Sequence, residues 1–431
     1  MANEQGKSGT STRREFLGGL AAATAAIGAA SAWSRVSIAQ TTKPNSRIGV
    51  GCIGMGSRQG AHLDSLRWLK DQGKEPVDIV AVCDVYRPRM QRAADALKAK
   101  GYMDHRELLK DPNVDVVCIA TPDHIHAPVA IDAMRAGKDV YCEKPFTHWR
   151  QFEVAKQAAA ECTKAGRVFQ LGTQGMSDPA WHQAAGLIKD GLIGQPIHAE
   201  CGYFRVGDWG ERGMPIDDKN AKAGADLNWE AFLGDSPKRE FDVSRFFRWR
   251  MYEDYSGGPV TDLFPHSMTP VVFMLGVGLP SLAVATGGKF RYDEREVPDT
   301  FNMLVDYPQK LTVAVLGTQG NNLSGTGDRG SGGRCPIIRG WEGSLMFQGG
   351  QINFIPAEGS QKKAQQFKVS GGESLVDHWK NLLTCVRNHD PKTNSPITMA
   401  YHVQTAFIMA MHALRAGKTA KFDAAKEQIV L

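Results

Sequence analysis

The chain has 431 residues, of which 42% are hydrophobic and 23% charged, and it carries a net charge of +5. Such a length is sufficient for two or three domains with packed cores, and the composition is that of a soluble globular protein. The small positive charge comes without a long basic run, which argues against nucleic acid as a partner.

The first 39 residues are typical of a twin-arginine export signal, and we exclude them from the fold. The pair Arg13-Arg14 precedes an uncharged stretch over 16–33, whose Ala and Gly content suits a signal better than a membrane anchor. A polar linker follows over 40–46. The alternative is a chance Arg-Arg pair before an alanine-rich helix, which its position and flanks disfavour. We therefore expect export to the periplasm by the twin-arginine translocase, without a membrane anchor.

Short β-rich runs alternate with helical patterns between residues 47 and 171. Gly137 and Gly166 stand where two of the helices should end, since glycine suits the left-handed backbone found there. The alternation predicts βαβ units and a parallel sheet, and we place this first domain at 47–165. The predicted strands are 47–53, 77–83, 114–120, 139–142 and 167–171, and the predicted helices are 61–72, 87–100, 126–136 and 152–165.

The pattern changes after residue 171 to longer runs, several of them with partial alternation. We expect a second domain over 166–431, of the α/β class, with a largely antiparallel sheet. Two loop-like stretches interrupt it, at 206–228 and 317–343, and the nine glycines of the second predict a lack of regular structure. The predicted strands are 197–204, 282–290, 300–307 and 311–317, and the predicted closing helices are 375–387 and 400–416.

Eight cysteines are present, an even number that invites a disulfide interpretation in an exported protein. Cys52, Cys83, Cys118 and Cys142 lie in or at the end of predicted core strands, where cysteine behaves as a small hydrophobe. We therefore expect no structural disulfide. The absence of a Cys-x-x-Cys pair gives no indication of zinc, and we expect no metal.

A glycine-rich loop follows the first predicted strand and opens a helix. Glycine at positions 54 and 56 permits a tight turn and lets the backbone approach a pyrophosphate, which the helix N-terminus stabilises. Ser57 and Arg58 continue the loop, and the third glycine, Gly60, comes one residue later than the usual spacing. The place between strand and helix makes Gly54 and Gly56 the start of a candidate dinucleotide site.

Asp84 ends the second predicted strand. A carboxylate at this point binds the hydroxyls of an adenosine ribose and repels a 2′-phosphate, which favours NAD over NADP. Arg58 and Arg87 are candidates for accommodating a phosphate, so NADP stays open as a cofactor. The alternative role of Asp84 is the N-cap of the next helix.

Glu143-Lys144-Pro145 follows the predicted strand at 139–142. It therefore lies at the carboxyl end of a parallel strand, where open α/β sheets bind ligands. With a nicotinamide held across that edge, Lys144 is placed to polarise a substrate hydroxyl or carbonyl. The alternative is a surface turn in which proline stops a strand.

Asp262 and His266 form a second candidate constellation. Their spacing of four residues predicts that both side chains lie on one face of a helix. A carboxylate beside an imidazole orients it and raises its basicity, as a general base near neutral pH requires. The alternative is a helix cap and a histidine of the core.

Taken together, these motifs resemble the Gfo/Idh/MocA oxidoreductases, typified by glucose–fructose oxidoreductase and inositol dehydrogenase. The resemblance covers nearly all of the chain after residue 46, and the segments 228–234 and 247–250 are similar to an exported branch. Two positions depart from the family pattern, the late Gly60 and Thr269, where many members have an aspartate. The motifs that carry the resemblance are the glycine loop, Asp84, Thr121-Pro122-Asp123-His124-Ile125-His126, Glu143-Lys144-Pro145 and Asp262-x-x-x-His266.

The resemblance implies a Rossmann NAD(P)-binding domain followed by an α/β domain whose open sheet often builds a homodimer or homotetramer. It implies that Lys144 binds the reacting oxygen, that His266 takes the hydroxyl proton and that Asp262 orients His266. Pro122 and His126 are expected to frame the nicotinamide. The implied cofactor contacts also include Thr121 and Glu143, the latter with a structural role as its alternative.

The activity that the resemblance implies is hydride transfer between NAD(P) and a hydroxyl of a sugar, cyclitol or glycoside. Some relatives use NAD for a transient oxidation during cleavage of a glycosidic bond, so a hydrolase or lyase is an alternative. Other relatives bind nucleotide and sugar only to regulate a partner. Retention of Lys144, Asp262 and His266 argues for an enzyme.

Overall fold

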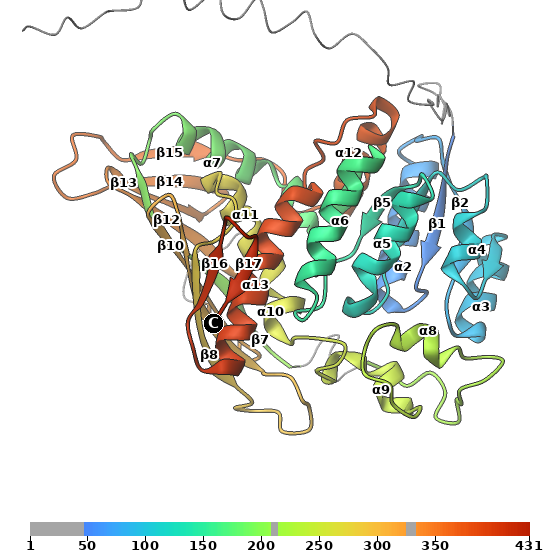
Figure 1. Cartoon of the computed structure of the whole chain (residues 1–431). Coiled ribbons are helices and arrows are strands. Elements are labelled where there is room, and N and C mark those ends of the chain that lie inside the picture. The colour runs from blue at the N-terminus through green and yellow to red at the C-terminus, as the bar shows by residue number, and fades with distance from the viewer. Residues whose placement is uncertain (1–46, 208–213, 325–332) are drawn as a thin grey trace, which may run out of the picture. The chain divides into compact units, whose positions relative to one another are not determined.

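The computed structural model describes residues 47–207, 214–324 and 333–431, and Figure 1 labels many of its elements. The predicted export signal and linker lie outside the described residues, so export stays a prediction. Across the part of the chain that is described, no helix has the length and apolar character that crossing a membrane requires.

A parallel sheet of six strands forms the first half of the described chain, in the order β3-β2-β1-β4-β5-β6. Side chains of α5 and α6 pack on one face, and those of α2 and α3 pack on the other. Because both faces are covered, β1 and β4 are buried at every position. The strands are β1 (Ile48–Ile53), β2 (Val77–Cys83), β3 (Lys100–Tyr102), β4 (Val116–Ile119), β5 (Asp139–Cys142) and β6 (Phe169–Leu171), and the helices are α2 (Ser57–Asp71), α3 (Arg87–Leu97), α4 (His105–Leu109), α5 (Asp123–Arg135) and α6 (Phe152–Ala165).

The predicted parallel sheet is confirmed, and the five predicted strands lie within a few residues of their expected bounds. The short elements β3 and α4 were not predicted, because neither contains an apolar run long enough to show a period. The sheet includes β6, so it continues past residue 165, where we expected the first domain to end.

The second sheet has eleven strands within the described ranges, in the order β15-β14-β13-β12-β7-β10-β9-β8-β16-β17, with β11 paired to β7. The pair of β10 and β7 is parallel, and the other pairs are antiparallel. This confirms the predicted largely antiparallel sheet. The strands are β7 (Pro196–Val206), β8 (Leu282–Gly288), β9 (Thr300–Tyr307), β10 (Leu311–Thr318), β11 (Gly320–Asn321), β12 (Gly333–Gly340), β13 (Gly343–Gln348), β14 (Gln351–Pro356), β15 (Gln365–Lys368), β16 (Ala420–Asp423) and β17 (Gln428–Val430).

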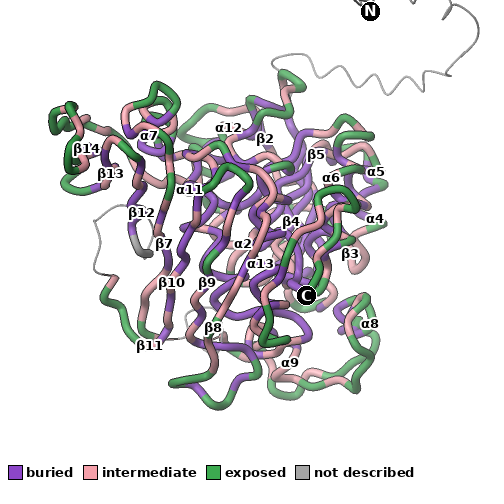
Figure 2. Tube along the Cα trace, turned by 60° about the vertical axis from the view of Figure 1, so that its left-hand side comes forward, coloured by how far each residue is buried: buried purple, intermediate pink, exposed green. Residues whose placement is uncertain are grey.

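One face of the second sheet is covered by helices and the other is partly exposed (Figure 2). Along β9, Met303 and Val305 are buried, whereas Leu304 between them is exposed. The covering helices α7, α11 and α13 account for this alternation, since only one face of the sheet has a partner. The remaining helices are η1 (Gln174–Ser177), α7 (Pro179–Lys189), α8 (Trp229–Leu233), α9 (Val243–Phe247), η2 (Trp249–Met251), α10 (Pro259–Asp262), α11 (Phe264–Leu275), α12 (Leu375–Asn388) and α13 (Ile397–Ala416).

The last two helices pack on the parallel sheet, and α13 also joins its core to that of the second sheet. Trp379 and Leu382 of α12 are fully buried against α2 and the parallel sheet. Helix α13 contributes Ile408 to the core of the first sheet and Phe407 and Met411 to the core of the second. The first sheet therefore depends on residues from the far end of the chain.

The glycine-rich stretch at 317–343 is more regular than its composition predicts. Strand β12 (Gly333–Gly340) pairs with β7, with Ile337 opposite Glu200 and Ile338 opposite Ala199. Our expectation of no regular structure is wrong for this strand. The apolar residues of the strand interior find partners on both neighbouring strands, and this pairing outweighs the low strand propensity of the glycines around it.

All eight cysteines are buried, and each is a thiol in the structure. Their burial agrees with the expectation that they act as small hydrophobic residues of the core. Burial also raises the pKa of thiols such as Cys52 and Cys162, which keeps them in the unreactive protonated form.

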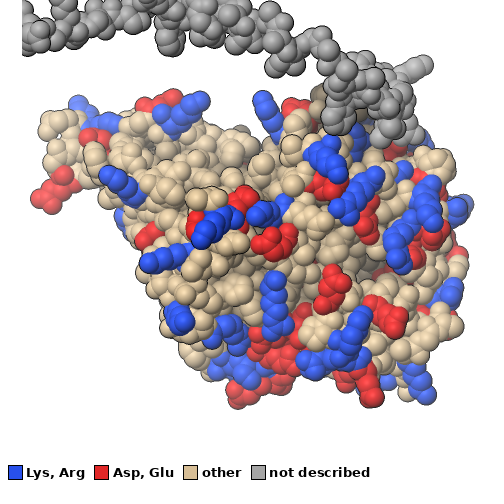
Figure 3. Space-filling model, viewed as in Figure 1, with Lys and Arg blue, Asp and Glu red and all other residues tan. Residues whose placement is uncertain are grey.

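Charged side chains of both signs are mixed over the face shown in Figure 3. Many charged residues of the protein form ion pairs near its surface, such as Arg135 with Glu161 at 3.0 Å and Lys156 with Glu427 at 3.3 Å. Exposed pairs of this kind contribute about 0–1 kcal/mol each. The stability of the fold therefore rests mainly on burial of the two cores.

Candidate active site

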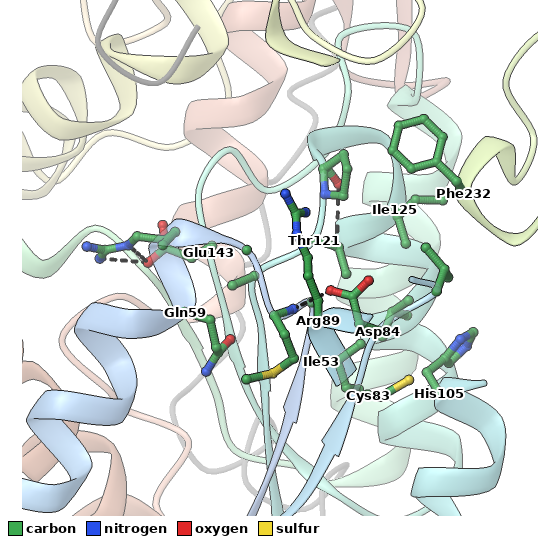
Figure 4. A pocket seen from close by; sticks show the side chains of 18 of the residues that line it. Ile53, Gln59, Cys83, Asp84, Arg89, His105, Thr121, Ile125, Glu143 and Phe232 are labelled. Carbon is green, nitrogen blue, oxygen red and sulfur yellow. Dashed lines mark hydrogen bonds and ion pairs between the residues drawn. The ribbon is translucent and has the colours of Figure 1, made fainter. Parts of the chain in front are cut away.

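A cavity of about 810 Å³ lies at the carboxyl ends of β1, β2, β4 and β5. The strand order of the parallel sheet reverses between β1 and β4, and such switch points are where these sheets bind ligands. Figure 4 shows Asp84, Thr121 and Glu143 around this cavity. The predicted cofactor residues all line it, namely Gly54, Gly56, Ser57, Arg58, Asp84, Thr121, Pro122, His126 and Glu143.

The glycine loop has one position at which glycine is required. Gly54 has a φ of +87°, and a Cβ added there would lie 2.7 Å from the carbonyl oxygen of Ala120. A Cβ at Gly60 would meet nothing within 4 Å, so the late third glycine has no steric role. Helix α2 begins after Gly56 without a side-chain cap, which leaves N–H groups of its first turn available to an anion.

Asp84 holds the two loops that follow β1 and β2. Its Oδ2 accepts a hydrogen bond from the Met55 N–H at 2.7 Å, and its Oδ1 accepts one from the Tyr86 N–H at 2.8 Å. Burial raises the pKa of Asp84, and the charge of Arg89 opposes the rise. The N-cap of α3 is Tyr86, so Asp84 is not that cap. Its remaining lone pairs face the cavity and suit the hydroxyls of a ribose.

The two arginines that we considered for a phosphate are engaged elsewhere. Arg58 Nη2 lies 2.8 Å from Glu143 Oε1, and Arg87 Nε lies 2.9 Å from Asp226 Oδ1. Arg87 is not among the residues that line the cavity. Arg89, which the sequence reasoning missed, does line it, and it lies beside Asp84 in Figure 4.

Glu143 is a buried anchor between β5 and helix α2. Arg58 Nη2 lies 2.8 Å and His62 Nε2 lies 3.0 Å from its Oε1. The indole N–H of Trp379 donates to His62 Nδ1 at 3.1 Å, and because indole only donates, the proton of neutral His62 is on Nε2 and points at Glu143. Burial raises the pKa of Glu143, but Arg58 and His62 outweigh burial and hold it well below its usual range.

His126 lies between the loops that follow β4 and β5. Its Nδ1 is 2.6 Å from the carbonyl oxygen of Pro145, and its Nε2 is 2.8 Å from that of Thr121. Burial lowers the pKa of His126 to about 4, so the ring is neutral at pH 7 and donates to only one of these carbonyls at a time. His126 therefore holds Thr121 close to the Lys144-Pro145 turn.

Lys144 and Asp262 are brought together from positions 118 residues apart. The Lys144 Nζ donates to Asp262 Oδ1 at 2.8 Å and to the Asp262 carbonyl oxygen at 2.5 Å. Arg250 Nε lies 3.3 Å from the same Oδ1. Burial raises the pKa of Asp262, but Lys144 and Arg250 outweigh it and keep the carboxylate ionised. Lys144 lines the cavity, and one of its three N–H donors remains for a substrate oxygen.

Asp262 and His266 do not form the predicted pair in the structure. Helix α10 ends at Asp262 and α11 begins at Phe264, so the two residues do not share one helix. The Asp262 carboxylate contacts Lys144 and Arg250, while the enclosed Nδ1 of His266 has no partner within the described residues. Burial and then the Lys144 charge lower the pKa of His266 to about 3, so the ring is a neutral imidazole. Neither Asp262 nor His266 is among the residues lining the cavity.

Asp123 is a buried carboxyl that the sequence reasoning passed over. Thr261 Oγ1 donates to its Oδ2 at 3.2 Å, and its Oδ1 has no partner within the described ranges. Burial raises the pKa of Asp123 to about 7, against the opposing charge of Arg250. The motif Thr121–His126 contained this signal, because a carboxyl at the first turn of a buried helix cannot reach solvent.

Replacement of Asp123 by asparagine should stabilise the protein above neutral pH. Between pH 4 and 7 the folded state holds a proton that the unfolded chain releases, so the free energy of unfolding falls as pH rises through that window. Asp123→Asn removes this loss. We expect the free energy of unfolding of the variant, compared with that of wild type, to be about 1–3 kcal/mol higher at pH 8 than at pH 4. Urea unfolding at several pH values measures the difference. Parallel curves for wild type and variant would contradict the assignment, and Asp64→Asn on the exposed side of α2 is the control.

The lining of the cavity fits a nicotinamide dinucleotide. The Gly54 turn and the uncapped start of α2 suit a pyrophosphate, and Asp84 suits a ribose. Thr121 and Lys144 lie on the same cavity at the ends of β4 and β5. A dinucleotide held along this edge would thus have its reactive ring next to Lys144.

Two family models match the chain. An oxidoreductase family described as an NAD-binding Rossmann fold matches residues 48–173, and the C-terminal alpha/beta domain of the same family matches residues 181–282. Together they match more than half of the chain. The chain belongs to the GFO/IDH/MocA oxidoreductase family. This confirms the family resemblance, and it makes the first domain an NAD-binding Rossmann domain.

Curated relatives of this GFO/IDH/MocA member include enzymes of two kinds. Inositol 2-dehydrogenase of Salmonella typhimurium is 36% identical over 161 residues, which are 37% of this chain and 45% of the relative. Alpha-N-acetylgalactosaminidase of Shewanella oneidensis is 27% identical over 177 residues, which are 38% of this chain and 36% of the relative. The chain thus spans less than half the length of these curated relatives.

Solved structures of similar fold extend over both domains. The WlbA dehydrogenase from Bordetella pertussis, in complex with NADH and UDP-GlcNAcA, has a TM-score of 0.62 at 18% identity and covers 88% of this chain and 99% of its own. A levoglucosan dehydrogenase in complex with NADH and levoglucosan has the same TM-score and identity, covering 89% and 99%. At this identity the likeness establishes the two-domain fold of the GFO/IDH/MocA chain.

Proposed function

We propose that this GFO/IDH/MocA protein is an exported NAD-dependent dehydrogenase that oxidises or forms a hydroxyl of a sugar, cyclitol or glycoside. The observation that carries the proposal is the Lys144–Asp262 pair, with an Nζ to Oδ1 distance of 2.8 Å beside the nucleotide cavity. Asp262 fixes the ammonium in place and leaves one N–H donor directed to a ligand. The curated inositol 2-dehydrogenases support a polyol substrate.

In the proposed reaction, the bound nicotinamide supplies the acceptor or donor of the hydride. Lys144 holds the substrate oxygen, and its positive charge stabilises the alkoxide that develops as the hydroxyl proton leaves. As the acceptor of that proton we propose His266, a neutral imidazole that does not itself line the cavity and whose Nδ1 has no partner within the described residues. Pro122 and His126, which line the cavity, would frame the nicotinamide. Because Asp262 binds Lys144, its role is to position the lysine and balance its charge.

The experiment that tests this proposal has two parts. The mature protein is denatured, and the released nucleotide is identified by mass spectrometry. A panel of sugars, cyclitols and glycosides is then tested with NAD while NADH absorbance at equilibrium is recorded. NAD binding together with lasting NADH production supports the dehydrogenase. Failure to bind any nicotinamide nucleotide, by release or by calorimetry, would contradict it.

Redox-assisted cleavage of a glycoside is the second candidate function. It is supported by relatives named alpha-N-acetylgalactosaminidase and glycosyl hydrolase family 109 protein 1. In such a reaction a transient oxidation is reversed after the bond is cleaved, so sugar is released without net NADH. Product analysis beside the absorbance assay separates the two functions. A third alternative, a regulator that only binds nucleotide and sugar, predicts neither product.

Export and assembly complete the proposal. The predicted twin-arginine signal at 1–39 supports the proposal that the twin-arginine translocase carries the folded protein to the periplasm. Exposed apolar side chains on the open face of the second sheet, such as Leu304 and Ile355, support a homodimer or homotetramer formed through that face.

A further inference from the structure

We propose that Asp217 is a specificity-determining residue for the cofactor, because it engages the arginine that would otherwise bind a 2′-phosphate. The inference rests on the proposed use of NAD, and it adds a second determinant to Asp84. The arginine is Arg89 on α3, and Asp217 comes from the segment 214–228, which precedes α8.

The position of Arg89 is the first step. Arg89 lines the nucleotide cavity with Asp84, and its charge opposes the rise in the pKa of that carboxyl. A Cβ built on Gly56 would lie 3.8 Å from Arg89 Nη1, which places the guanidinium next to the glycine loop. The ribose hydroxyls of a dinucleotide lie between this loop and the end of β2. Arg89 is therefore the cation placed to receive a phosphate on that ribose.

The second step is that Arg89 is already occupied. Its Nε donates to Asp217 Oδ2 at 2.6 Å, and the guanidinium lies 5.1 Å from the ring centre of Phe247. The Arg89 side chain is 17% exposed and that of Asp217 is 26% exposed, so the pair is only partly open to solvent. An aromatic ring below and a carboxylate at the side hold the guanidinium in one orientation.

The third step concerns charge. Asp217 also lines the cavity, so Asp84, Arg89 and Asp217 together bring two carboxylates and one guanidinium to the ribose region. A 2′-phosphate bound at Arg89 would lie beside these two carboxylates and would have to displace Asp217 from the guanidinium. Two neutral hydroxyls would meet no such cost. Arg92, an exposed residue that also lines the cavity, is the competing site for a phosphate.

The segment that carries Asp217 is anchored independently of this ion pair. The Arg87 N–H donates to the Asp226 carbonyl oxygen at 2.8 Å, and the Asn228 N–H donates to the Val85 carbonyl oxygen at 2.9 Å. Leu227 and Tyr86 also belong to one buried cluster, whose Phe246 and Phe247 line the cavity. Replacement of the Asp217 carboxylate should therefore leave the segment in place.

The test compares Asp217→Asn with Asp226→Asn. Both variants remove one carboxylate and one ion pair between this segment and α3, but the Arg87–Asp226 pair, 2.9 Å apart, does not line the cavity. Each protein is incubated with equal concentrations of NAD and NADP, and the nucleotide retained after desalting is measured by mass spectrometry. We expect Asp217→Asn to raise the ratio of NADP to NAD at least tenfold and Asp226→Asn to leave it within twofold. Combining Asp217→Asn with Arg89→Ala should abolish the gain.

Three results would overturn the proposal. One is an unchanged ratio in Asp217→Asn while melting temperatures show that the variant is folded. Another is a gain that persists without Arg89, which would assign the phosphate to Arg92. The last is a wild-type protein that already retains NADP over NAD. Because the readout is retained nucleotide, absence of dehydrogenase activity would contradict the proposed function and leave this test intact.

Discussion

Lys144→Ala is expected to lower turnover by about 10²–10⁴, the range that loss of a group acting on the transferred proton or oxyanion produces. The ammonium lies in the nucleotide cavity and is held by the carboxylate and the carbonyl of Asp262. Its removal takes away the donor for the substrate oxygen and leaves the glycine loop untouched. Steady-state kinetics and calorimetry should therefore show a loss of kcat with nearly unchanged nucleotide affinity.

Further variants separate catalysis from stability at this site. Loss of Lys144 also leaves the buried Asp262 with Arg250 as its remaining partner, so the melting temperature is recorded for each variant. Asp262→Asn should be milder, because the amide still accepts a hydrogen bond from Lys144. Lys156→Ala removes a surface lysine paired to Glu427 and serves as the control. A Lys144→Ala enzyme with turnover within threefold of wild type would refute the assignment. His266→Ala should show a similar loss if its imidazole is the base.

Glu143→Ala should lower the free energy of unfolding by about 3 kcal/mol, as breaking a buried ion pair by removing one partner does. Glu143 is 3% exposed and accepts from both Arg58 and His62. Without it, His62 loses the acceptor for its Nε2 proton. Arg58 is partly open to water, which limits the loss to the lower end of the usual range. Urea unfolding followed by fluorescence measures the change.

A matched control for Glu143 is Glu107→Ala. Glu107 accepts from Lys110 at 2.6 Å, but this pair is exposed, and its loss should cost less than about 1 kcal/mol. Glu143→Ala should also weaken nucleotide retention, because Arg58 belongs to the glycine loop. Equal effects of the two substitutions would mean that Glu143 is not the anchor that its contacts indicate.

Much of the fold could be predicted from local sequence patterns. The runs at 77–83 and 139–142 coincide with β2 and β5, because the strands of a parallel sheet covered by helices are mostly apolar. The glycine loop and Asp84 could be placed for the same reason, since each follows such a strand directly. The pattern failed at β12, where pairing with two neighbours outweighs a glycine-rich composition.

The site was harder to predict where contacts come from distant parts of the chain. The i, i+4 spacing of Asp262 and His266 suggested a partnership, but the helix breaks at Leu263 and the carboxylate meets Lys144 and Arg250. No local pattern gives a partner 118 residues away. The pairing of Arg89 with Asp217, across 128 residues, was invisible for the same reason.

The burial of α12 against the nucleotide domain has a consequence for the order in which the chain is built. Trp379 stacks on Tyr141 of β5 with ring centres 4.6 Å apart, and its indole N–H donates a hydrogen bond to His62 of α2. A nascent chain therefore cannot complete the hydrophobic core of its first domain until residues near its far end have left the ribosome. The nucleotide domain, although encoded first, acquires its native packing only with the last part of the chain.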